Sequence, residues 1–347
     1  MKQPLVVKLG SSLVAGDDGE PRWAVLQPRA KEIAGLVESG VPVCVVSSGA
    51  IALGLRRLGA VRRPRRLPRL QAASALGQAE LQRAWDSALA AHGATAAQVL
   101  LTAAETADRR AYVNVRNALA ELFAIGAVPV VNENDATATD EISFGDNDML
   151  AAHVAVLCRA RLLVLLTSAE GVFTSPPGTS GATLIEDGAV ARDAVFGAAD
   201  ALGRGGMASK VGAAELASAG GIPAVIASGT ADGVVTRLAA GEAHGTRFDA
   251  RGSPQSAFKL WLRFGKQVAA RVQIDEGAQR ALIGRGASLL AVGVHSWEGD
   301  FASGDGIEIV GPDGTPIARG ISALDSSEMH DRRRNAELVH RDRLVLL

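Results

Sequence analysis

Six short apolar runs alternate with segments of helical periodicity, and this alternation constrains the fold of the chain more than any other feature. The predicted buried strands are Leu5–Leu9, Pro42–Val46, Ala96–Leu101, Ala127–Val131, Leu162–Leu166 and Ile222–Ala227. The predicted helices are Val25–Ser39, Gln71–His92, Tyr112–Ile125, Asp148–Arg159 and Met207–Ala219. Strands that alternate with helices pair in parallel and are covered on both faces. The pattern therefore predicts an α/β fold, a three-layer α/β/α sandwich around a mainly parallel open sheet.

At 347 residues the chain is long enough for about two domains, and the sequence pattern changes after about residue 250. The stretch Asp249–Pro254 has the composition of a linker, and segments of alternating polarity follow it. The strands predicted there are Val268–Ile274, Leu289–Val292, Gly306–Val310 and Pro316–Ile321. We expect an α/β domain over residues 1–250, a linker over 251–266, and a small, mostly β domain over 267–347.

Composition limits the classes of function. The net charge of -1 argues against a general polyanion binder, although a local basic patch remains possible. Average usage would give about 24 glycines. The chain has 39, which predicts the close backbone approaches that phosphate sites require. The two cysteines allow no disulfide framework. No apolar run is long enough for a signal peptide or a membrane span, so we expect a cytoplasmic protein without a membrane partner.

Two polar clusters follow the apolar run Ala127–Val131, which we expect to end as a strand at Val131. The clusters are Asn132-Glu133-Asn134-Asp135 and Gly145-Asp146-Asn147-Asp148. In open α/β sheets, ligands bind at the carboxyl ends of strands. The clusters therefore predict a pocket for a polar ligand, with an Asx-rich turn as the structural alternative.

Other strand ends and one helix start carry similar signals. They are Lys8-Leu9-Gly10-Ser11-Ser12, Ser47-Ser48-Gly49-Ala50-Ile51, Thr167-Ser168 and the segment Gly203–Lys210. A lysine on an apolar strand is costly unless its ammonium meets an anion, and a helix N-terminus can hold a negative group. Singly, each has an ordinary explanation, such as an N-cap for Ser48 or a solvent-facing Lys210. Together, two lysines, backbone donors and an orienting acid indicate phosphoryl transfer.

The motifs, in this order, resemble those of the glutamate 5-kinases, a branch of the amino acid kinase family. The most specific are Val131–Ala136 and Phe144–Asp148, and the region from about Val268 resembles the PUA domain appended to many bacterial members. The resemblance implies that ATP phosphorylates the side-chain carboxylate of L-glutamate to L-glutamyl 5-phosphate, the first step of proline biosynthesis. Mg²⁺ would bridge the phosphate oxygens of ATP. A carboxylate acceptor needs no strong general base.

The resemblance also assigns roles by position. Lys8 and Lys210 would neutralise the transferring phosphoryl group, and Asp148 would hold the two lysines in place. The glutamate-binding residues would be Ser48, Asp135 and Asn147. The ATP-binding residues would be Lys8, Thr167, Ser168, Arg204, Gly205, Gly206, Met207, Ala208, Ser209 and Lys210. The family usually has an acidic residue at the position of Ser168 and threonine at that of Arg204. No protein ligand for the metal is identified.

Two alternative functions remain open. One is another kinase of the same family, acting on acetylglutamate, aspartate or UMP. The other is an RNA-binding protein that uses the PUA domain, although aromatic residues at 4% leave few surfaces for base stacking. Further expected partners are proline as a feedback inhibitor and a second copy of the chain in a homo-oligomer, a dimer or a tetramer. The arginine-rich stretch Arg56–Arg69 is predicted to be a solvated loop. The alternatives are an anion-attracting lip over the phosphate site and, third, a nucleic-acid contact.

Overall fold

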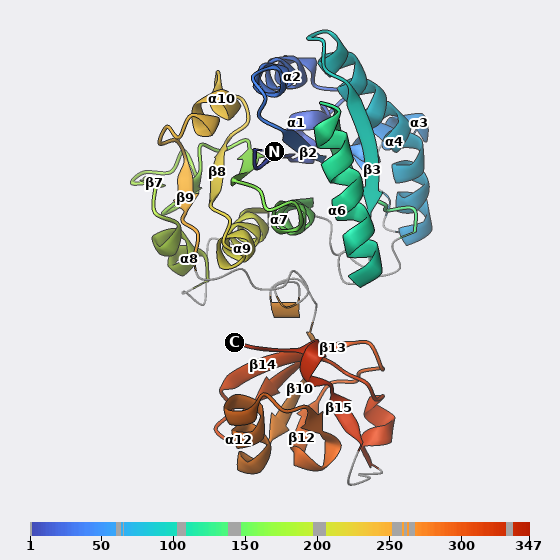
Figure 1. Ribbon diagram of the computed structural model, residues 1–347, viewed down its shortest axis with the longest axis vertical. Helices are drawn as coiled ribbons and strands as arrows, with labels where there is room; N and C mark the ends of the chain where they lie inside the picture. The colour runs from blue at the N-terminus through green and yellow to red at the C-terminus, as the bar shows by residue number, and fades with distance from the viewer. Residues whose placement is uncertain are drawn as a thin grey trace. The chain divides into compact units, whose positions relative to one another are not determined.

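The computed structural model describes residues 2–59, 64, 66–102, 109–137, 147–196, 206–251, 259, 262–263, 268–330 and 336–347. The chain divides into two compact units, Met1–Pro254 and Gln255–Leu347, and each has its own apolar core (Figure 1). Most of the expected linker, 251–266, lies outside the described residues.

A seven-stranded sheet forms the centre of the first unit, with the order β3-β4-β2-β1-β5-β8-β9. Its strands are β1 (Leu5–Leu9), β2 (Val43–Ser47), β3 (Ala96–Leu101), β4 (Val128–Glu133), β5 (Leu162–Thr167), β8 (Ala224–Ser228) and β9 (Thr246–Phe248). All neighbours pair in parallel except β9, which runs antiparallel to β8 at one edge. The prediction of a mainly parallel sheet is confirmed.

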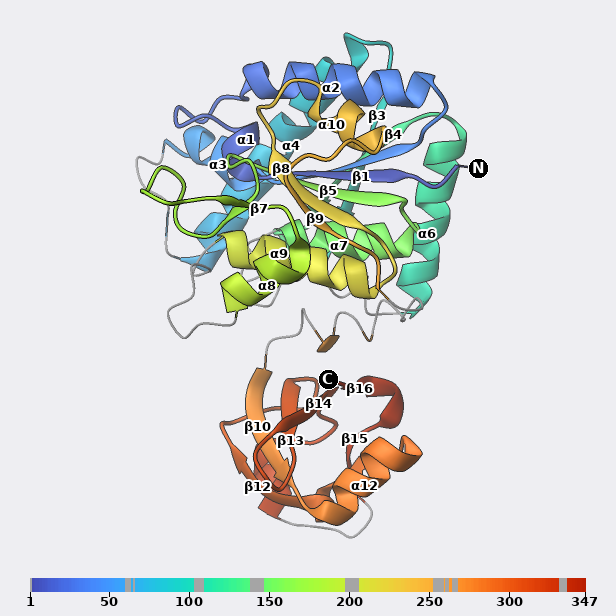
Figure 2. The same ribbon diagram turned by 90° about the vertical axis from the view of Figure 1, so that its left-hand side faces the viewer.

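Helices cover both faces of this sheet, which gives the three predicted layers. They are α1 (Ser11–Val14), α2 (Trp23–Glu38), α3 (Ala50–Arg57), α4 (Leu67–Ala90), α6 (Arg109–Ala124), α7 (Asn147–Leu157), α8 (Gly188–Phe196), α9 (Gly206–Ala219) and α10 (Val234–Ala239). Figure 2 shows α2 and α10 on one face and α7, α8 and α9 on the other. A short hairpin joins β6 (Val172–Phe173) to β7 (Leu184–Ile185).

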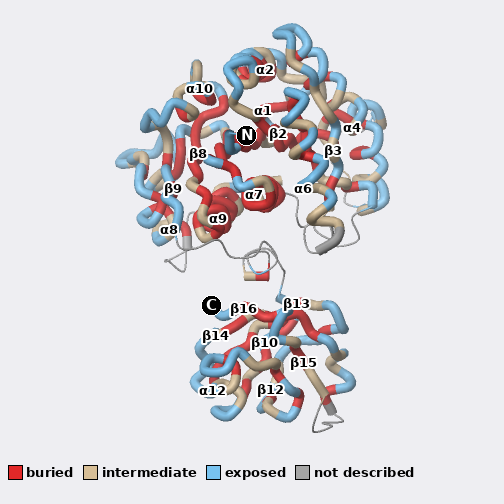
Figure 3. The backbone as a smooth tube through the Cα atoms, viewed as in Figure 1, coloured by how far each residue is buried: buried red, intermediate tan, exposed pale blue. Residues whose placement is uncertain are grey.

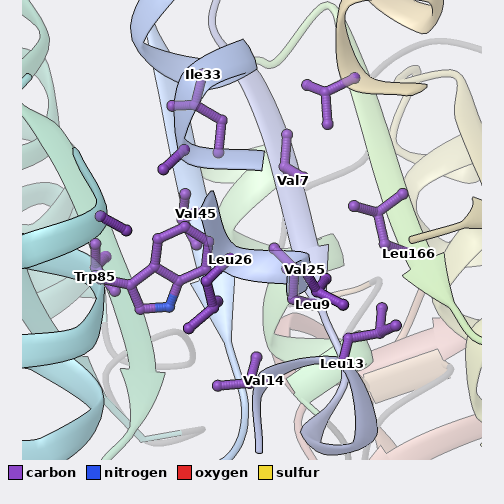
Figure 4. Packing of buried hydrophobic residues seen from close by; sticks show 14 of the residues in the cluster. Val7, Leu9, Leu13, Val14, Val25, Leu26, Ile33, Val45, Trp85 and Leu166 are labelled. Atoms are coloured by element: carbon purple, nitrogen blue, oxygen red, sulfur yellow. The ribbon is translucent and has the colours of Figure 1, made fainter. Parts of the chain in front are cut away.

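The central strand β1 divides its side chains between the two faces of the sheet. Leu5, Val7 and Leu9 belong to the apolar cluster that includes residues of α2 and α4, among them Trp85 (Figure 4). Because successive side chains of a strand point to opposite faces, Lys8 emerges on the side of α7 and α9. This pleat places a buried cation between the sheet and two helices.

Helices α7 and α9 are buried along most of their length (Figure 3). Both are apolar nearly all round, as expected for helices without a solvent face. Asp148 and Lys210 are polar exceptions, with exposed fractions of 0% and 8%. Such groups are found in a protein interior only when they are paired or bind a ligand.

Helices α3 and α4 touch through their backbones. A Cβ atom added at Gly54 would lie 1.8 Å from the carbonyl oxygen of Ala73, and one added at Gly77 would lie 1.8 Å from that of Ala50. No side chain fits at either position. The two glycines therefore allow α3 and α4 to cross in direct contact.

Most element boundaries in the first unit differ from the prediction by a few residues, and two of these differences have a clear physical reason. Strand β4 does not end at Val131 but continues through Asn132 and Glu133, because these residues stay in register with β3. Helix α4 begins four residues before the predicted Gln71, at Leu67, with a proline in its first turn, where no backbone N–H is lost. Among the described helices, none is both long enough and apolar enough to cross a membrane.

The second unit is mostly β. Its five-stranded sheet has the order β12-β10-β13-β14-β16. The strands are β10 (Val268–Ile274), β12 (Val294–Glu298), β13 (Gly306–Val310), β14 (Pro316–Ile321) and β16 (Leu344–Leu346), beside the pair β11 (Leu289–Leu290) and β15 (Glu337–Val339). The predicted strand Leu289–Val292 is wrong in its second half, which forms a 3-10 turn (Ala291–Gly293). A helix that the sequence pattern did not predict, α12 (Glu276–Arg285), lies between β10 and β11.

Candidate active site

The carboxyl ends of four adjacent strands, β4, β2, β1 and β5, carry the polar residues that the sequence singled out. Parallel pairing brings these ends to one edge of the sheet, as expected for a ligand site in an α/β fold. Two groups of side chains occur there, and they differ in chemistry.

The first group, which we call the lysine centre, consists of Lys8, Asp148 and Lys210. Lys8 Nζ lies 2.5 Å from Asp148 Oδ1, and Lys210 Nζ lies 3.1 Å from Asp148 Oδ2. Lys210 also donates to the carbonyl oxygen of Gly206, at 3.2 Å, in the first turn of α9. All three side chains are buried. Two ammonium groups share one carboxylate, so the centre carries excess positive charge, which a phosphoryl group can neutralise.

The other residues predicted to bind a nucleotide lie at the end of β5 and at the start of α9. Thr167 is the last residue of β5, half-buried, and the exposed Ser168 follows it. Helix α9 begins at Gly206, packs against β5, and carries Met207, Ala208 and Ser209 in its first turn. Arg204 and Gly205 lie outside the described residues. The structure thus brings these two segments to neighbouring elements.

The second group surrounds a cavity of about 110 Å³, which we call the amide pocket. Its lining residues are Ser11, Ser48, Gly49, Ala50, Ile51, Ala52, Leu55, Asn132, Glu133, Asp135 and Asn147. All three residues predicted to bind glutamate are in this set. The N-terminus of α3 also faces the cavity, following Gly49, whose φ of 115° suits glycine. Its first N–H groups can receive a carboxylate.

Asn147, the first residue of α7, connects the walls of the amide pocket. Its Nδ2 donates to Ser48 Oγ at 3.0 Å and to Asn132 Oδ1 at 2.9 Å. Its Oδ1 accepts from the backbone N–H of Glu133 at 3.2 Å. Because Asp148 follows Asn147 directly, one turn of α7 carries a residue of the amide pocket and the carboxylate of the lysine centre. The two groups of side chains are therefore adjacent.

Sequence reasoning did not assign a role to Asn132 or Glu133, although both belong to a motif that it identified. The structure places both in the lining of the amide pocket. Burial, and secondarily the neighbouring carboxylate of Asp135, raises the pKa of Glu133 to about 7. The signal available in the sequence was the motif itself, Asn132–Asp135, in which four consecutive residues carry polar side chains.

A larger cavity, of about 420 Å³, lies among Glu186, Glu215, Arg247 and Arg251, apart from both groups. Its arginines are already paired, Arg247 with Asp249 and Arg251 with Glu215. We assign the substrate site to the amide pocket, because the amide pocket adjoins the lysine centre and the larger cavity does not.

The arginine-rich stretch lies partly outside the described residues. The loop prediction is wrong at both ends of the stretch, because Arg56 and Arg57 end helix α3 and Arg69 lies in the first turn of α4. Arg56 and Arg57 form ion pairs with Glu20 and Glu80. Their role as a lip over a phosphate site stays a prediction. In the part of the chain that the structure describes, no group of three or more His, Cys, Asp or Glu side chains is placed to hold a metal ion.

Comparison with known proteins identifies the family of the chain. The profile of the amino acid kinase family matches residues 3–228, and that of the PUA domain matches residues 270–341. Glutamate 5-kinase of Burkholderia cenocepacia (strain HI2424) is 44% identical over 362 residues, which cover 99% of this chain and 97% of that protein. The figures are the same for glutamate 5-kinase of Burkholderia multivorans (strain ATCC 17616 / 249). A solved isopentenyl phosphate kinase is 22% identical, with a TM-score of 0.49, and the match covers 70% of this chain and 98% of that one.

Proposed function

The chain belongs to the amino acid kinase family, in its glutamate 5-kinase branch and with a C-terminal PUA domain, and we propose that it phosphorylates L-glutamate with ATP. An oxygen of the side-chain carboxylate attacks the γ-phosphorus, and the bond from that phosphorus to the β-phosphate oxygen breaks. The products are L-glutamyl 5-phosphate and ADP. This reaction is the first step of proline biosynthesis.

One observation carries the proposal: the lysine centre adjoins a pocket lined by amides, hydroxyls and the carboxyl groups of Glu133 and Asp135. Phosphoryl transfer depends on positioning and on neutralising charge, and it needs little covalent chemistry from the protein. Lys8 and Lys210 supply positive charge on the two sides of the transferring group. Asp148, bonded to both, holds their ammonium groups in place. The acceptor oxygen is already ionised at neutral pH, so no general base is required.

In the amide pocket, complementary charges orient the amino acid. The carboxylate of Asp135 suits the α-ammonium group of glutamate. Ser48 and the N–H groups at the start of α3 suit a carboxylate. Asn147 contributes the rigid wall that the pocket shares with the lysine centre. The other end of the substrate is thereby directed toward Lys8 and Lys210.

On the donor side, Thr167, Ser168, Arg204 and the segment from Gly205 to Lys210 would hold ATP. We assign Mg²⁺ to the nucleotide, as the MgATP co-substrate, because Mg²⁺ keeps several waters and binds mainly phosphate oxygens in such sites. Both oxygens of Asp148 face ammonium groups, so this carboxylate serves the lysines. The residues of the site therefore suit Mg²⁺ that is bound to the phosphates of ATP.

Proline resembles cyclised glutamate, so we propose that it binds the amide pocket as a competitive inhibitor. Titrating proline at low and high glutamate tests this, because inhibition that glutamate cannot relieve would contradict a shared site.

A homo-oligomer is supported by the edge strand β3, whose Leu100 is 37% exposed, and by Ile125, 75% exposed in the turn before β4. Sedimentation of the Ile125→Glu variant tests that surface. Nucleic-acid binding by the PUA domain remains a proposal from the resemblance, and a cytoplasmic location remains a proposal from the sequence pattern.

The function is tested by an ADP-release assay with L-glutamate, N-acetylglutamate, aspartate and UMP as acceptors. We expect glutamate to give the highest kcat/KM, and hydroxylamine to trap the acyl phosphate as a hydroxamate. Preference for N-acetylglutamate would place the chain in another branch of the family. ADP release without dependence on any of the four acceptors would contradict the proposed reaction.

A further inference from the structure

Helix α4 reaches the amide pocket from behind, through side chains that do not line the cavity. Ser74 Oγ donates to Asp135 Oδ2 at 2.6 Å, and Gln78 Oε1 accepts from Asn132 Nδ2 at 2.7 Å. Ser74 and Gln78 are four residues apart, so they lie on one stripe of the helix. Each contacts a pocket residue more than fifty positions away in the chain.

A third contact extends this stripe to the next strand. Trp85, seven residues after Gln78, is fully buried, and its Nε1 donates to Ser47 Oγ at 2.8 Å. Ser47 directly precedes Ser48 at the end of β2. Three polar contacts of α4 thus meet the ends of β4 and β2, where the pocket is built.

The contact between Ser74 and Asp135 is the strongest of the three. Both residues are buried, with exposed fractions of 3% and 8%. A hydrogen bond to an ionised carboxylate is shorter and stronger than a neutral one, and a low local dielectric strengthens it further. The hydroxyl therefore fixes the orientation of the carboxylate that would hold the α-ammonium group of glutamate.

Gln78 is the first residue of a longer chain of hydrogen bonds. The side-chain amides in this chain are oriented so that each N–H group meets an oxygen of the next residue. Gln78 accepts from Asn132, whose Oδ1 accepts from Asn147, and Asn147 donates its second N–H to Ser48. The two N–H groups of Asn147 are then both used within the protein. Ser48 Oγ accepts from Asn147, so its own proton points elsewhere and can be donated to a substrate carboxylate.

The base of this arrangement is rigid. Gly77 lies between Ser74 and Gln78, and there the backbone of α4 touches that of α3. Helix α3 in turn supplies Ala50, Ile51 and Leu55 to the lining of the pocket. The distance between the stripe of α4 and the pocket residues of α3 is therefore fixed.

We propose that Ser74 and Gln78 are positioning residues, which set the affinity for the acceptor without touching it. The inference rests on the proposed glutamate kinase activity. Ser74→Ala should raise the KM for glutamate about tenfold, because a hydrogen bond to a charged group contributes about 1.5–3 kcal/mol. Gln78→Met, which keeps the side-chain length, should raise it about fivefold, as for a neutral hydrogen bond. The KM for ATP and kcat should each change by less than about twofold. The variants weaken the binding of glutamate equally in the ground state and in the transition state.

Three controls separate positioning from general damage. Ser87→Ala changes an exposed serine of the same helix and should leave both KM values unchanged. Ser74→Thr keeps the hydroxyl and should restore most of the glutamate affinity. In the background Asp135→Asn, Ser74→Ala should have a much smaller effect, because coupled residues do not add.

An unchanged KM for glutamate in both Ser74→Ala and Gln78→Met would overturn the inference. So would an equal rise in the KM for ATP, or an undiminished effect of Ser74→Ala in the Asp135→Asn background. A wild-type protein that fails to phosphorylate glutamate would instead refute the proposed function. Melting temperatures of all variants show whether a change arises from unfolding, and Ser74→Thr keeps the test decisive if Ser74→Ala is unstable.

Discussion

The lysine centre and the amide pocket lie side by side, yet they are built from opposite kinds of interaction. The lysine centre consists of three buried charges that pair with one another. The amide pocket consists mainly of neutral groups in a hydrogen-bonded network that joins α4, β4, α7 and the loop between β2 and α3. The first suits any phosphoryl donor, because it recognises charge. The second can distinguish one amino acid from another, because it recognises the placement of donors and acceptors.

The comparison predicts that damage to the two regions differs in kind as well as in size. A lysine removed from the lysine centre weakens the stabilisation of the transition state, while Asp148 keeps the other lysine as its partner. A neutral group removed from the amide pocket weakens binding and leaves the chemical step nearly intact.

The largest effect is expected at the lysine centre. Lys8→Ala and Lys210→Ala should each lower kcat by about a hundredfold or more, since one preorganised charge stabiliser typically contributes roughly 10²–10³ in kcat. Initial rates at saturating glutamate and ATP measure this, with the exposed Lys31→Ala as a matched control. Near-normal turnover in both purified, folded variants would remove the lysine centre from the mechanism.

A smaller effect, and one confined to glutamate, is expected in the amide pocket. Asp135→Ala and Asn147→Ala should raise the KM for glutamate about 10- to 100-fold, as for hydrogen bonds to charged groups. The KM for ATP should change by less than about threefold. Asn114→Ala, an exposed change on α6, is the control. If ATP affinity falls instead, the two regions have been assigned to the wrong substrates.

The amide pocket should also respond to pH, through the carboxyl group of Glu133. Burial raises the pKa of Glu133 to about 7, so this carboxyl is largely neutral below pH 7 and becomes a second negative charge beside Asp135 above it. Because glutamate carries a net negative charge, its KM should rise severalfold between about pH 6 and pH 8.5. Glu133→Gln should remove the rise.

Thermal unfolding gives an independent measurement of the same group. A carboxyl whose folded pKa is raised contributes stability that is fully present below about pH 4.5 and is lost as the pH rises through about 7. Relative to Glu133→Gln, the wild-type protein should therefore become less stable over that window. A pH-independent difference between the two proteins would show that Glu133 titrates normally.

The smallest effect is expected from the second unit. We propose that residues 1–250 form the kinase domain and residues 267–347 a PUA domain joined by the segment 251–266. A chain truncated after Ser256 should keep kcat within about threefold, because both groups of side chains lie in the first unit, which has its own core. A truncated chain that is folded but inactive would show that the second unit completes the site.

The central strands and the motif residues could be predicted from the sequence, because their signals are local. Buried parallel strands appear as continuous apolar runs, and a lysine within one of them indicates an anion. Strand β9 (Thr246–Phe248) is too short and too polar at its centre to give such a signal. Helix α12 had capping signals in Asp275 and Gly286, but its single buried side chain, Leu282, gives almost no apolar stripe.

The support of the amide pocket could not be predicted, for a different reason. Ser74 and Gln78 lie in a stretch of α4 that is rich in small and polar residues, 71–78, where neither stands out. Their partners are Asp135 and Asn132, 61 and 54 residues away. The rotation of α4 about its axis decides these contacts, and tertiary packing sets that rotation. The strand boundary at Val131 was predicted wrongly for a related reason, because pairing with β3 outweighs the polarity of Asn132.

The contact of α3 and α4 at Gly54 and Gly77 also bears on how the acceptor preference of such an enzyme could be altered. Since no side chain separates the two backbones, the helices cannot move closer, and any larger residue would force them apart. An evolving or engineered variant is therefore confined to exchanging side chains on a fixed frame, such as Ile51 or Leu55. A mutant library directed at these lining positions should yield altered selectivity, whereas one directed at the two glycines should yield mainly unfolded protein.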